Sequence, residues 1–427
     1  MKIAETGFET FKLNKQLLQG VELTGYSVPT PVQMMAIPPV FGGQDVVAIA
    51  PSGTGKTAAF LLPALMKIRY TQEGNPRVFV LAPTRELVMQ ITALAKSLAQ
   101  KTDIRIVGIY GGTGTKPQIQ AISEGCDLLV TTPGRFLELY SLGHIILKKI
   151  SMVVLDEADR LLDMGFREQI SRIFDALPQR KQILLFSATT NAKVMSMVDE
   201  LMPFPNIIET DPTQVTAKNI TEKVYFVPNI KTKVNLLWHL MKDEEQFKKV
   251  MIFCRSKLTV NNIYKFILRT SKWEEESVKA LHGNKDQNTR LKIVKDFFEG
   301  NVKVLVATDI AARGLDFSSI THVFNFDVPM MYEDYVHRIG RTGRHFVPGD
   351  SITFCTPAEE YHLKKIEKLI GHKIPVSKIP DETLYGETNV EEKKLMDIEI
   401  DRQRRKENPD FKGAFHIKKF LQKPGKK

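Results

Sequence analysis

The chain has 427 residues, of which 43% are hydrophobic and 26% are charged, with a formal net charge of +11. This length exceeds what one hydrophobic core normally serves, so we expect a globular protein with two domains. No run approaches the roughly 18 uncharged apolar residues of a membrane span, and the N-terminus lacks the apolar core of a signal peptide. We therefore expect a cytoplasmic protein with no membrane partner.

The positive charge is concentrated at the C-terminus. Residues 402–427 hold ten Lys and Arg against Glu407 and Asp410, a net charge of +8, which leaves +3 for residues 1–401. A basic tail on a nearly neutral body predicts binding to a polyanion, with nucleic acid as the first candidate. A solvated end that only aids solubility is the alternative, and composition does not decide between the two.

The three cysteines, Cys126, Cys254 and Cys355, are far apart in the sequence and have no metal-ligand spacing. At least two of them lie in apolar runs, so we expect buried, reduced thiols.

Short apolar runs alternate with longer helical patterns in the first half of the chain. Because these runs are apolar nearly throughout, they predict strands buried on both faces of a parallel sheet. The stretches between them are long enough for crossover helices, which indicates a doubly wound α/β architecture. The expected strands are residues 45–50, 78–83, 105–110, 127–132, 152–157 and 182–189.

A second series of strands follows a break near residues 202–219, where three prolines and many polar residues interrupt the alternation. We expect two α/β domains of similar size, over residues 1–209 and 220–380, joined by a linker at 210–219. After about residue 380 the strand signal stops, so residues 381–427 are expected to form a flexible, basic, disordered tail. The strands expected in the second domain are residues 222–227, 250–254, 302–309, 321–328 and 351–356.

A phosphate-binding loop is predicted where the first strand runs into "PSGTGKTAAF". Gly53 and Gly55 permit backbone conformations in which successive N–H groups point at one phosphate, and the helix that follows adds the positive end of its dipole. Lys56 would reach the β- and γ-phosphates, and the Thr57 hydroxyl would ligand Mg²⁺. The strict pattern begins with Gly where this chain has Ala50; an ordinary Gly-rich turn is the alternative. The predicted loop residues are Ser52, Gly53, Thr54, Gly55, Lys56 and Thr57.

An acidic cluster ends the apolar strand of "MVVLDEAD". Asp156 at the strand end can hold a metal ion, and Glu157 can orient and deprotonate an attacking water. The competing interpretation, in which these carboxylates complement a helix dipole, suits Asp159 well. It fits Asp156 and Glu157 less well, because an unpaired charge at the end of a buried strand is costly.

Taken together, the motifs resemble those of DEAD-box ATP-dependent RNA helicases. They occur in family order over residues 8 to about 345, both expected domains, and the chain looks most similar to the small bacterial RhlE-type subgroup. The resemblance implies two tandem RecA-like domains, ATP and Mg²⁺ as cofactors, and RNA as partner. The motifs are "APSGTGKT", "PTREL", "TPGR", "DEAD", "SAT", "ATDIAARGLD" and "HRIGRTGR".

By this resemblance, "GYSVPTPVQ" would read the adenine base. Gln33 would hydrogen-bond the adenine edge, Tyr26 would flank the ring, and Phe8 matches the isolated upstream aromatic residue. Without the resemblance, Gln33 would be a surface residue and Phe8 a core residue. Ser187 and Thr189 of "SAT" would contact the acidic cluster and couple the nucleotide state to domain closure; alone they could be strand-end hydroxyls.

The second domain would complete the nucleotide site. The resemblance assigns Arg341 and Arg344 to the γ-phosphate as arginine fingers, since a planar guanidinium neutralises charge spread over phosphoryl oxygens. Without the first domain, a basic helix face on a nucleic-acid surface would be preferred. Gly314 and Asp316 would lie at the nucleotide, with Asp316 as the ribose contact, whereas Asp309 is expected to be a structural partner of the arginines. His337 would meet Asp159 when the domains close.

Contacts with RNA are expected along both domains. They are mostly small residues, hydroxyl residues and arginines, which suit backbone phosphates and 2′-hydroxyls better than base edges, so binding should be independent of sequence. Each one taken singly could simply build its loop. The expected residues are Pro83, Thr84, Arg85, Gly111, Gly112, Thr132, Gly134, Arg135, Arg255, Gly283, Gln287, Arg290 and Thr308.

The resemblance implies an RNA-dependent ATPase that separates short duplexes or remodels RNA–protein complexes by closing two domains on single-stranded RNA. Ribosomal precursors and mRNA-decay proteins are candidate partners. One alternative is a DNA helicase or translocase on the same fold, which would be stimulated equally by DNA. Another alternative is a clamp or scaffold that rarely hydrolyses ATP. The presence of a suitable residue at every catalytic position argues against it.

Overall fold

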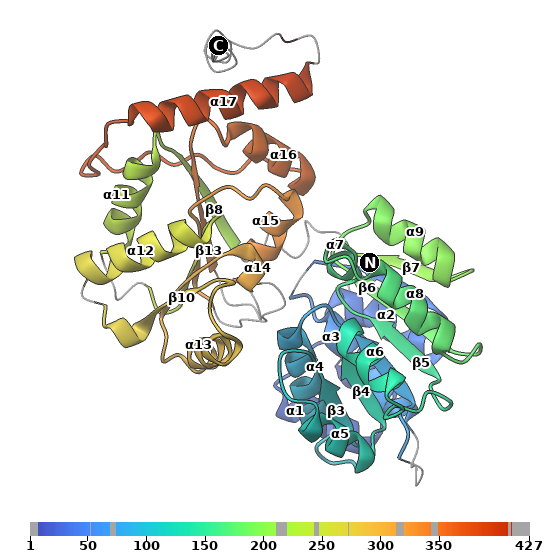
Figure 1. The fold of residues 1–427 in the computed structure, drawn as a ribbon. Helices are drawn as coiled ribbons and strands as arrows, with labels where there is room; N and C mark the ends of the chain where they lie inside the picture. The colour runs from blue at the N-terminus through green and yellow to red at the C-terminus, as the bar shows by residue number, and fades with distance from the viewer. Residues whose placement is uncertain are drawn as a thin grey trace, which may run out of the picture. The chain divides into compact units, whose positions relative to one another are not determined.

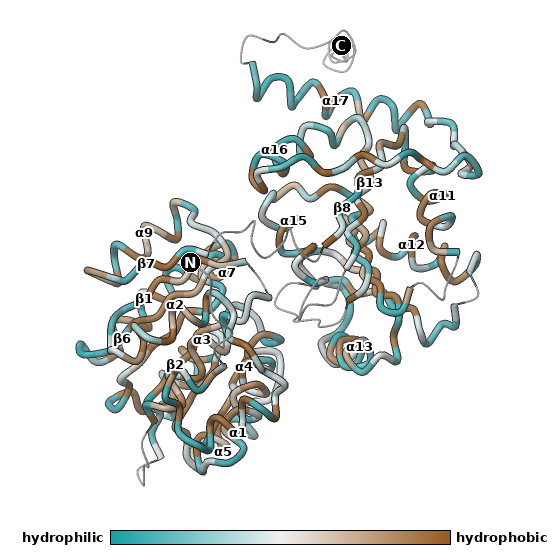
Figure 2. Tube along the Cα trace, turned by 180° about the vertical axis from the view of Figure 1, so that it is seen from behind, coloured by the Kyte–Doolittle hydropathy of each residue, from teal (hydrophilic) through white to brown (hydrophobic). Residues whose placement is uncertain are grey.

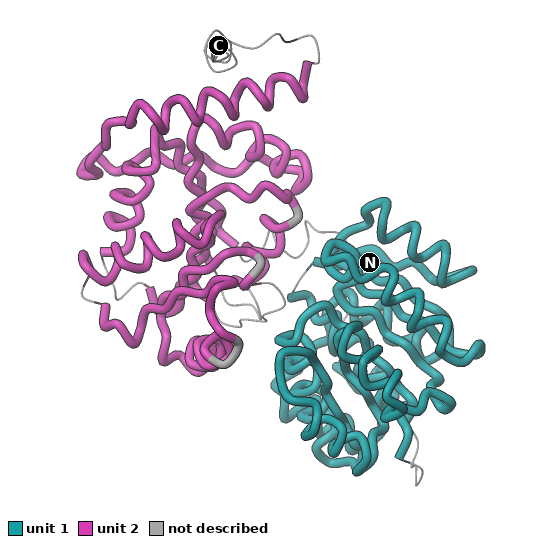
Figure 3. The backbone as a smooth tube through the Cα atoms, in the orientation of Figure 1, with its two compact units in different colours: residues 1–215, 313–316 teal, residues 216–312, 317–427 magenta. Residues whose placement is uncertain are grey.

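A computed structural model of the chain describes residues 7–51, 53–68, 74–210, 220–242, 247–271, 273–312, 320–342, 349–408 and 411. The chain divides into two compact units, residues 1–215 with 313–316 and residues 216–312 with 317–427 (Figure 3). Each unit is an α/β layer structure built around one parallel sheet (Figure 1).

The sheet of unit 1 has seven strands in the order β3-β4-β2-β5-β6-β1-β7, and every pairing in it is parallel. Parallel neighbours need crossover connections, which the intervening helices supply. The strands are β1 (Val46–Ile49), β2 (Val78–Leu81), β3 (Ile106–Ile109), β4 (Leu128–Thr131), β5 (Met152–Leu155), β6 (Gln182–Ser187) and β7 (Asn206–Glu209).

Helices cover both faces of this sheet (Figure 1). One face packs against η1 (Phe8–Phe11), α1 (Lys15–Leu23), α2 (Pro31–Phe41), α3 (Lys56–Lys67) and α4 (Arg85–Leu98). The other packs against α5 (Lys116–Ser123), α6 (Pro133–Ser141), α7 (Ala158–Asp163), α8 (Arg167–Ala176) and α9 (Ala192–Leu201).

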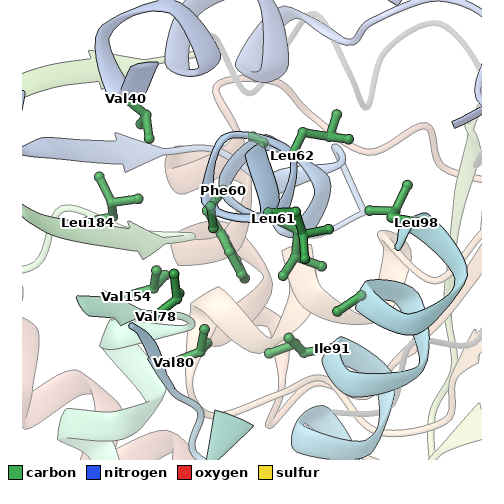
Figure 4. Close-up of a cluster of buried hydrophobic side chains, with 14 of the residues drawn as sticks. Val40, Phe60, Leu61, Leu62, Val78, Val80, Ile91, Leu98, Val154 and Leu184 are labelled. Carbon is green, nitrogen blue, oxygen red and sulfur yellow. The ribbon is translucent and has the colours of Figure 1, made fainter. Parts of the chain in front are cut away.

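Alternate residues of each strand supply the two cores. Val78 and Val80 face the core that contains Phe60 of α3, shown in Figure 4, whereas Phe79 and Leu81 belong to the core on the opposite face. This division follows from the two-residue period of a strand. Burial on both faces explains why the strand sequences are apolar throughout.

The sheet of unit 2 has six strands in the order β10-β11-β9-β12-β13-β8, again all parallel. Numbered from its own first strand, this order is 3-4-2-5-6-1, the same as in the sheet of unit 1 without its last strand β7. The strands are β8 (Ile220–Phe226), β9 (Val250–Phe253), β10 (Val278–Leu281), β11 (Val304–Ala307), β12 (His322–Asn325) and β13 (Gly349–Cys355).

The helices described in unit 2 follow the same alternation as far as β13, after which two helices end the described chain. They are α11 (Ile230–Met241), α12 (Lys257–Thr270), η2 (Glu275–Ser277), α13 (Gln287–Glu299), α14 (Asp309–Ala312), α15 (Tyr332–Ile339), α16 (Glu360–Ile370) and α17 (Val390–Glu407).

The structure confirms all eleven strands expected from the sequence and adds β7 and β10. Strand β7 lies in the proline-rich stretch that reads as a break in the pattern. Strand β10 is only four residues long and carries Lys279, so it lacks a continuous apolar run.

The expectation of a disordered tail from residue 381 is wrong for residues 390–407, which form the helix α17. Figure 2 shows that this helix is largely hydrophilic, so it lacks the apolar stripe that would have indicated it. Polar contacts hold it instead: the backbone N–H of Ile230 donates to Glu392 Oε1 at 2.7 Å, and Gln403 Nε2 donates to the carbonyl of Ala358 at 2.8 Å.

The cysteines are buried and unpaired, as expected. Burial raises the pKa of the Cys126, Cys254 and Cys355 thiols, so the uncharged form is favoured. Among the described residues, no helix is both long and apolar enough to cross a bilayer.

Candidate functional site

Three expected segments meet at one edge of the unit 1 sheet. The phosphate-loop sequence follows β1, the acidic cluster follows β5 and "SAT" spans the end of β6. These strands are neighbours in the order β5-β6-β1 and run parallel, so their carboxyl ends lie together. Ligands of open α/β sheets bind at this edge.

The loop after β1 has the backbone of a phosphate cradle. Gly53 and Gly55 adopt φ values of 80° and 88°, in the left-handed region that favours glycine. A Cβ on Gly55 would lie 2.4 Å from Gln33 Nε2, so a side chain there would collide with its neighbour. Thr54 is buried, with its hydroxyl donating to the carbonyl of Pro51 at 2.8 Å, whereas Thr57 is half-buried. Ser52 lies outside the described residues.

Lys56 begins α3 and its side chain is buried. Its Nζ donates to the carbonyl of Ala50 and lies 3.4 Å from the carbonyl oxygens of Pro51 and Ser187. Burial lowers the pKa of Lys56, while the carboxylates of Asp159, Asp156 and Glu157 act in the opposite direction. The ammonium group thus has dipoles and acidic neighbours around it.

Gln33 joins the expected adenine segment to the phosphate loop. Its side chain is buried; Oε1 accepts from the N–H of Thr30 at 2.9 Å, and Nε2 donates to the carbonyl of Gly55 at 3.1 Å. The rings of Phe8 and Tyr26 stack with centroids 6.1 Å apart and an interplanar angle of 25°. The sequence alone would make Gln33 a surface residue, and the structure excludes that alternative.

In the acidic cluster Asp156 and Asp159 are buried and Glu157 is half-buried, and Glu157 has an unusual backbone conformation. Asp156 Oδ1 accepts from the N–H of Glu157 at 3.0 Å; burial and the adjacent Glu157 carboxylate raise the pKa of Asp156 to about 7. Glu157 adopts φ 51° and ψ 53° as the N-cap of α7. Its Oε2 lies 3.4 Å from Nη1 of Arg160, one turn further along the helix.

Asp159 links this cluster to the "SAT" segment. Its Oδ2 accepts from the N–H of Ala188 at 3.2 Å and from the hydroxyl of Thr189 at 3.4 Å. Ser187 is fully buried and donates from Oγ to the carbonyl of Thr189 at 2.8 Å. Asp159 and His337 belong to different units, so their expected contact stays a prediction.

The residues expected at RNA in unit 1 follow the other three neighbouring strands, β3, β4 and β2. Thr84 caps α4 by accepting from the N–H of Leu87 at 3.2 Å, and the Arg85 guanidinium lies 4.7 Å from the centre of the Tyr110 ring. Arg135 donates from Nη2 to the carbonyl of Thr113 at 2.9 Å. Pro83 is buried, Thr132 half-buried, and Gly111, Gly112 and Gly134 are exposed.

Arg85 and Arg135 share one further property. Both are largely buried, and each has a buried guanidinium nitrogen, Nη1, without a hydrogen-bond partner in the structure. Packing thus shields these donors from solvent without giving them an acceptor, which is costly.

Their counterparts in unit 2 follow the equivalent strands β9, β10 and β11. Arg255 comes two residues after β9, Gly283 two residues after β10, and Thr308 directly after β11. Arg290 lies in α13, as does Gln287, whose side chain is outside the described part of the structure.

Arg338 is the anchor of the "HRIGR" segment rather than a free cation. It forms a two-pronged ion pair with Asp309, at 2.6 Å from Nε and 2.8 Å from Nη2, as expected for a structural partner. His337 and Arg341 are both buried beside it. Gly314, Asp316 and Arg344 lie outside the described residues.

Sequence reasoning missed several polar residues that contact these segments. Arg160 faces Glu157, and Lys233 and Glu359 form a buried ion pair at 2.7 Å that also involves Arg255. Arg160, Lys233 and Glu359 belong to none of the predicted motifs, because their roles arise only where separate elements meet.

Two parallel α/β units with a glycine cradle, a buried lysine and an acidic strand end define the RecA-like class of nucleotide-driven helicases. The chain belongs to the DEAD/DEAH box helicase family: that family model matches residues 30–198, and the helicase conserved C-terminal domain matches residues 232–346.

Curated relatives include ATP-dependent RNA helicase RhlB of Pectobacterium atrosepticum, 38% identical over 393 residues, which are 90% of each chain. RhlB of Pseudomonas putida is 38% identical over 389 residues, 89% of this chain and 96% of the relative. The chain is an ATP-dependent RNA helicase. The expected RhlE-type subgroup is not confirmed, since these relatives are named RhlB.

Solved structures agree with this assignment. Dbp5 of S. cerevisiae bound to RNA and ADP BeF3 matches with a TM-score of 0.79 and 31% identity, over 89% of this chain and 96% of that one. Mss116p bound to ssRNA and AMP-PNP matches with a TM-score of 0.78 and 25% identity, over 97% and 89%.

Proposed function

We propose that this helicase separates short RNA duplexes or remodels RNA–protein complexes by closing its two units on single-stranded RNA, driven by ATP. One observation carries the proposal: the functional residues divide by strand. Those expected at the nucleotide in unit 1 follow β1, β5 and β6, and those expected at RNA follow β3, β4 and β2. In unit 2 most of the residues expected at RNA follow the equivalent strands.

The residues of unit 1 fit an Mg²⁺-bound nucleotide. The Gly53–Gly55 cradle and the buried Lys56 would receive the phosphates, and Gln33 would hold the base. Thr57 and Asp156 would hold Mg²⁺, which would neutralise charge on the phosphates. Among the described residues no cluster of three or more acidic, His or Cys residues forms a metal cage.

Glu157 is the general base of this proposal. It would accept a proton from the attacking water, which requires a carboxylate within hydrogen-bond reach of that water. Glu157 follows Asp156 just after the end of β5, and its Oε2 forms an ion pair with Nη1 of Arg160 at 3.4 Å.

Arg341 and Arg344 would reach the same phosphates on closure and stabilise the charge of the transition state. Gly314 and Asp316 would lie at the nucleotide, with Asp316 as the ribose contact. The hydrogen bonds of Asp159 with Ala188 and Thr189 would couple the nucleotide state to the "SAT" segment. His337 of unit 2 would contact Asp159 when the units close.

RNA would run along the residues after β3, β4 and β2, and along their counterparts in unit 2. Phosphate suits Arg85 and Arg135 as a ligand, because a planar guanidinium pairs well with phosphate oxygens. Because the closed form would bend the strand, a paired partner would no longer fit. We place this activity in the cytoplasm, with ribosomal precursors and mRNA-decay assemblies as candidate targets.

Reciprocal coupling tests the proposal. ATP and RNA should each tighten the binding of the other by the same factor, because both favour the closed form. We would measure ATP hydrolysis and nucleotide affinity with single-stranded RNA and with DNA of matched sequence. RNA should raise both and DNA should not. Equal stimulation by DNA would support a general translocase instead, and no stimulation by RNA would overturn the closure model.

A further inference from the structure

Three buried charges meet at the carboxyl edge of the unit 2 sheet. Lys233 of α11 is almost fully buried, and its Nζ donates to the carbonyl of Phe326 at 2.7 Å. The same Nζ lies 2.7 Å from Glu359 Oε2 and 3.3 Å from Asp327 Oδ1. Burial alone would lower the pKa of Lys233, but the Glu359 and Asp327 carboxylates outweigh it and raise the pKa.

Both carboxylate oxygens of Glu359 accept hydrogen bonds from several donors. Besides Lys233, its Oε2 accepts from the N–H of Thr356 at 3.0 Å and from the Thr356 hydroxyl at 2.8 Å. Its Oε1 accepts from the N–H of Val328 at 3.2 Å and from Nη2 of Arg255 at 3.1 Å. A buried carboxylate with this many donors has little freedom to move.

Arg255 is the only member of this group with a largely solvent-exposed side chain, 47% against 6% for Glu359. Its Nη2 also donates to the carbonyl of Val328 at 3.3 Å, and its backbone N–H donates to Asp327 Oδ2 at 2.8 Å. The Nη2 end of the guanidinium is therefore fixed to the protein. Within the described residues, Nε and Nη1 have no hydrogen-bond partner in the structure.

We propose that Glu359, held by Lys233, is a positioning residue that presents Arg255 to a backbone phosphate of the bound RNA. This inference rests on the proposed function, in which Arg255 contacts RNA. A flexible arginine loses rotamer freedom when it binds a ligand, and one already fixed in place loses less. The five donors of the planar guanidinium let Nη2 bind the carboxylate while the remaining N–H groups bind phosphate.

A double-mutant cycle tests the inference. The probe is a fluorescein-labelled 12-mer of oligo(U), titrated by anisotropy with AMP-PNP and Mg²⁺ present, using the full chain. Arg255→Gln and Glu359→Gln should each raise the RNA Kd by about three- to tenfold. The double variant should be no weaker than the weaker single variant, because both changes remove the same contact.

Thr356→Val provides a gentler route to the same question, because it removes one hydroxyl donor to Glu359 and changes no charge. It should raise the RNA Kd by a smaller factor. It also keeps the inference testable if Glu359→Gln does not fold, which thermal unfolding would reveal. Glu360→Gln is the matched control, one residue further on and with no recorded contact to Arg255, and it should leave the Kd unchanged.

The outcomes separate the two levels of the argument. If Arg255→Gln weakens RNA binding but Glu359→Gln and Thr356→Val do not, the positioning role is overturned and the proposed function stands. Multiplicative losses in the double variant would also overturn it. If Arg255→Gln has no effect, Arg255 is not an RNA contact and the inference falls, while RNA-stimulated ATP hydrolysis still tests the proposed function independently.

Discussion

Glu157 is one of two non-glycine residues with a positive φ among the described residues, the other being Lys12. A left-handed conformation costs a non-glycine residue about 1–2 kcal/mol, and such strain persists where surrounding contacts enforce it. Here α7 begins directly after Glu157, and Arg160 of that helix lies 3.4 Å from its carboxylate. The strained backbone therefore fixes the direction of the proposed base.

The first prediction concerns this carboxylate. Glu157→Gln should lower the rate of ATP hydrolysis by about 10²- to 10⁴-fold, because an amide cannot accept the proton of the attacking water. Nucleotide affinity should change little, since the phosphate cradle is intact. Steady-state hydrolysis and binding of a fluorescent ATP analogue would measure the two quantities.

Glu168→Gln in α8 is the matched control and should hydrolyse ATP like the parent, because Glu168 lies on an exposed helix surface. Normal turnover in Glu157→Gln would exclude Glu157 as the base.

Among the elements, α17 shows most clearly where sequence patterns fail to predict a helix. This helix has no apolar stripe, so hydrophobic periodicity could not reveal it. It is stabilised by tertiary contacts. Gln403 is buried and reaches the Ala358 carbonyl and, at 3.3 Å, Nε2 of His362. We propose that the second domain extends to residue 408 rather than to 380.

His362 makes this contact sensitive to pH. Burial lowers the pKa of His362, as do the nearby Arg255 and Lys406. The unfolded chain would have the ordinary value of about 6.5 and so binds more protons as the pH falls below it. The folded state then loses stability, since the His362 contribution is present above that pH and declines below it.

The second prediction follows from this sign. Asp156, whose raised pKa stabilises the folded state as the pH falls, acts in the opposite direction, so the prediction concerns the difference between two proteins. In urea unfolding at pH 7.5 and 5.5, His362→Gln should lose less stability at the lower pH than the parent does. His282 and His322 also have lowered pKa values, so part of the dependence should remain. An identical pH dependence in parent and variant would exclude His362 as a contributor.

At the scale of the whole molecule, the sequence predicts the doubly wound α/β architecture and the positions of the strand ends. It does not predict the interactions between elements. The phosphate loop and the acidic cluster could be placed because each directly follows an apolar strand. Gln33 needed the family resemblance, since nothing local indicates that it reaches Gly55. Lys233 and Glu359 are 126 residues apart and carry no motif, so only the packed sheet reveals their pairing.

The basic tail yields a third prediction, which α17 makes sharper. Deletion of residues 402–427 would cut into that helix, whereas deletion of 412–427 leaves it intact. The shorter deletion removes six lysines and no acidic residue. RNA affinity should fall and its dependence on salt should weaken, because fewer counterions are released, while basal ATP hydrolysis is spared.

Anisotropy titrations of labelled RNA over a series of KCl concentrations measure this slope. Replacing the six lysines by glutamine in the full-length chain is the matched control, because it removes charge without shortening the tail. A slope equal to that of the parent would leave only a solubility role for the tail.

The strand order that the two sheets share, apart from β7, bears on the evolution of the protein. Lys56 and Lys233 each stand seven residues after the end of the first strand of their sheet, at Ile49 and Phe226. Backbone carbonyls surround the first ammonium group, which is proposed to receive the nucleotide phosphates. The second ammonium group, that of Lys233, forms ion pairs with two carboxylates, those of Asp327 and Glu359. This is the pattern expected if one ancestral domain was duplicated and the second copy replaced its ligand with an internal counterion.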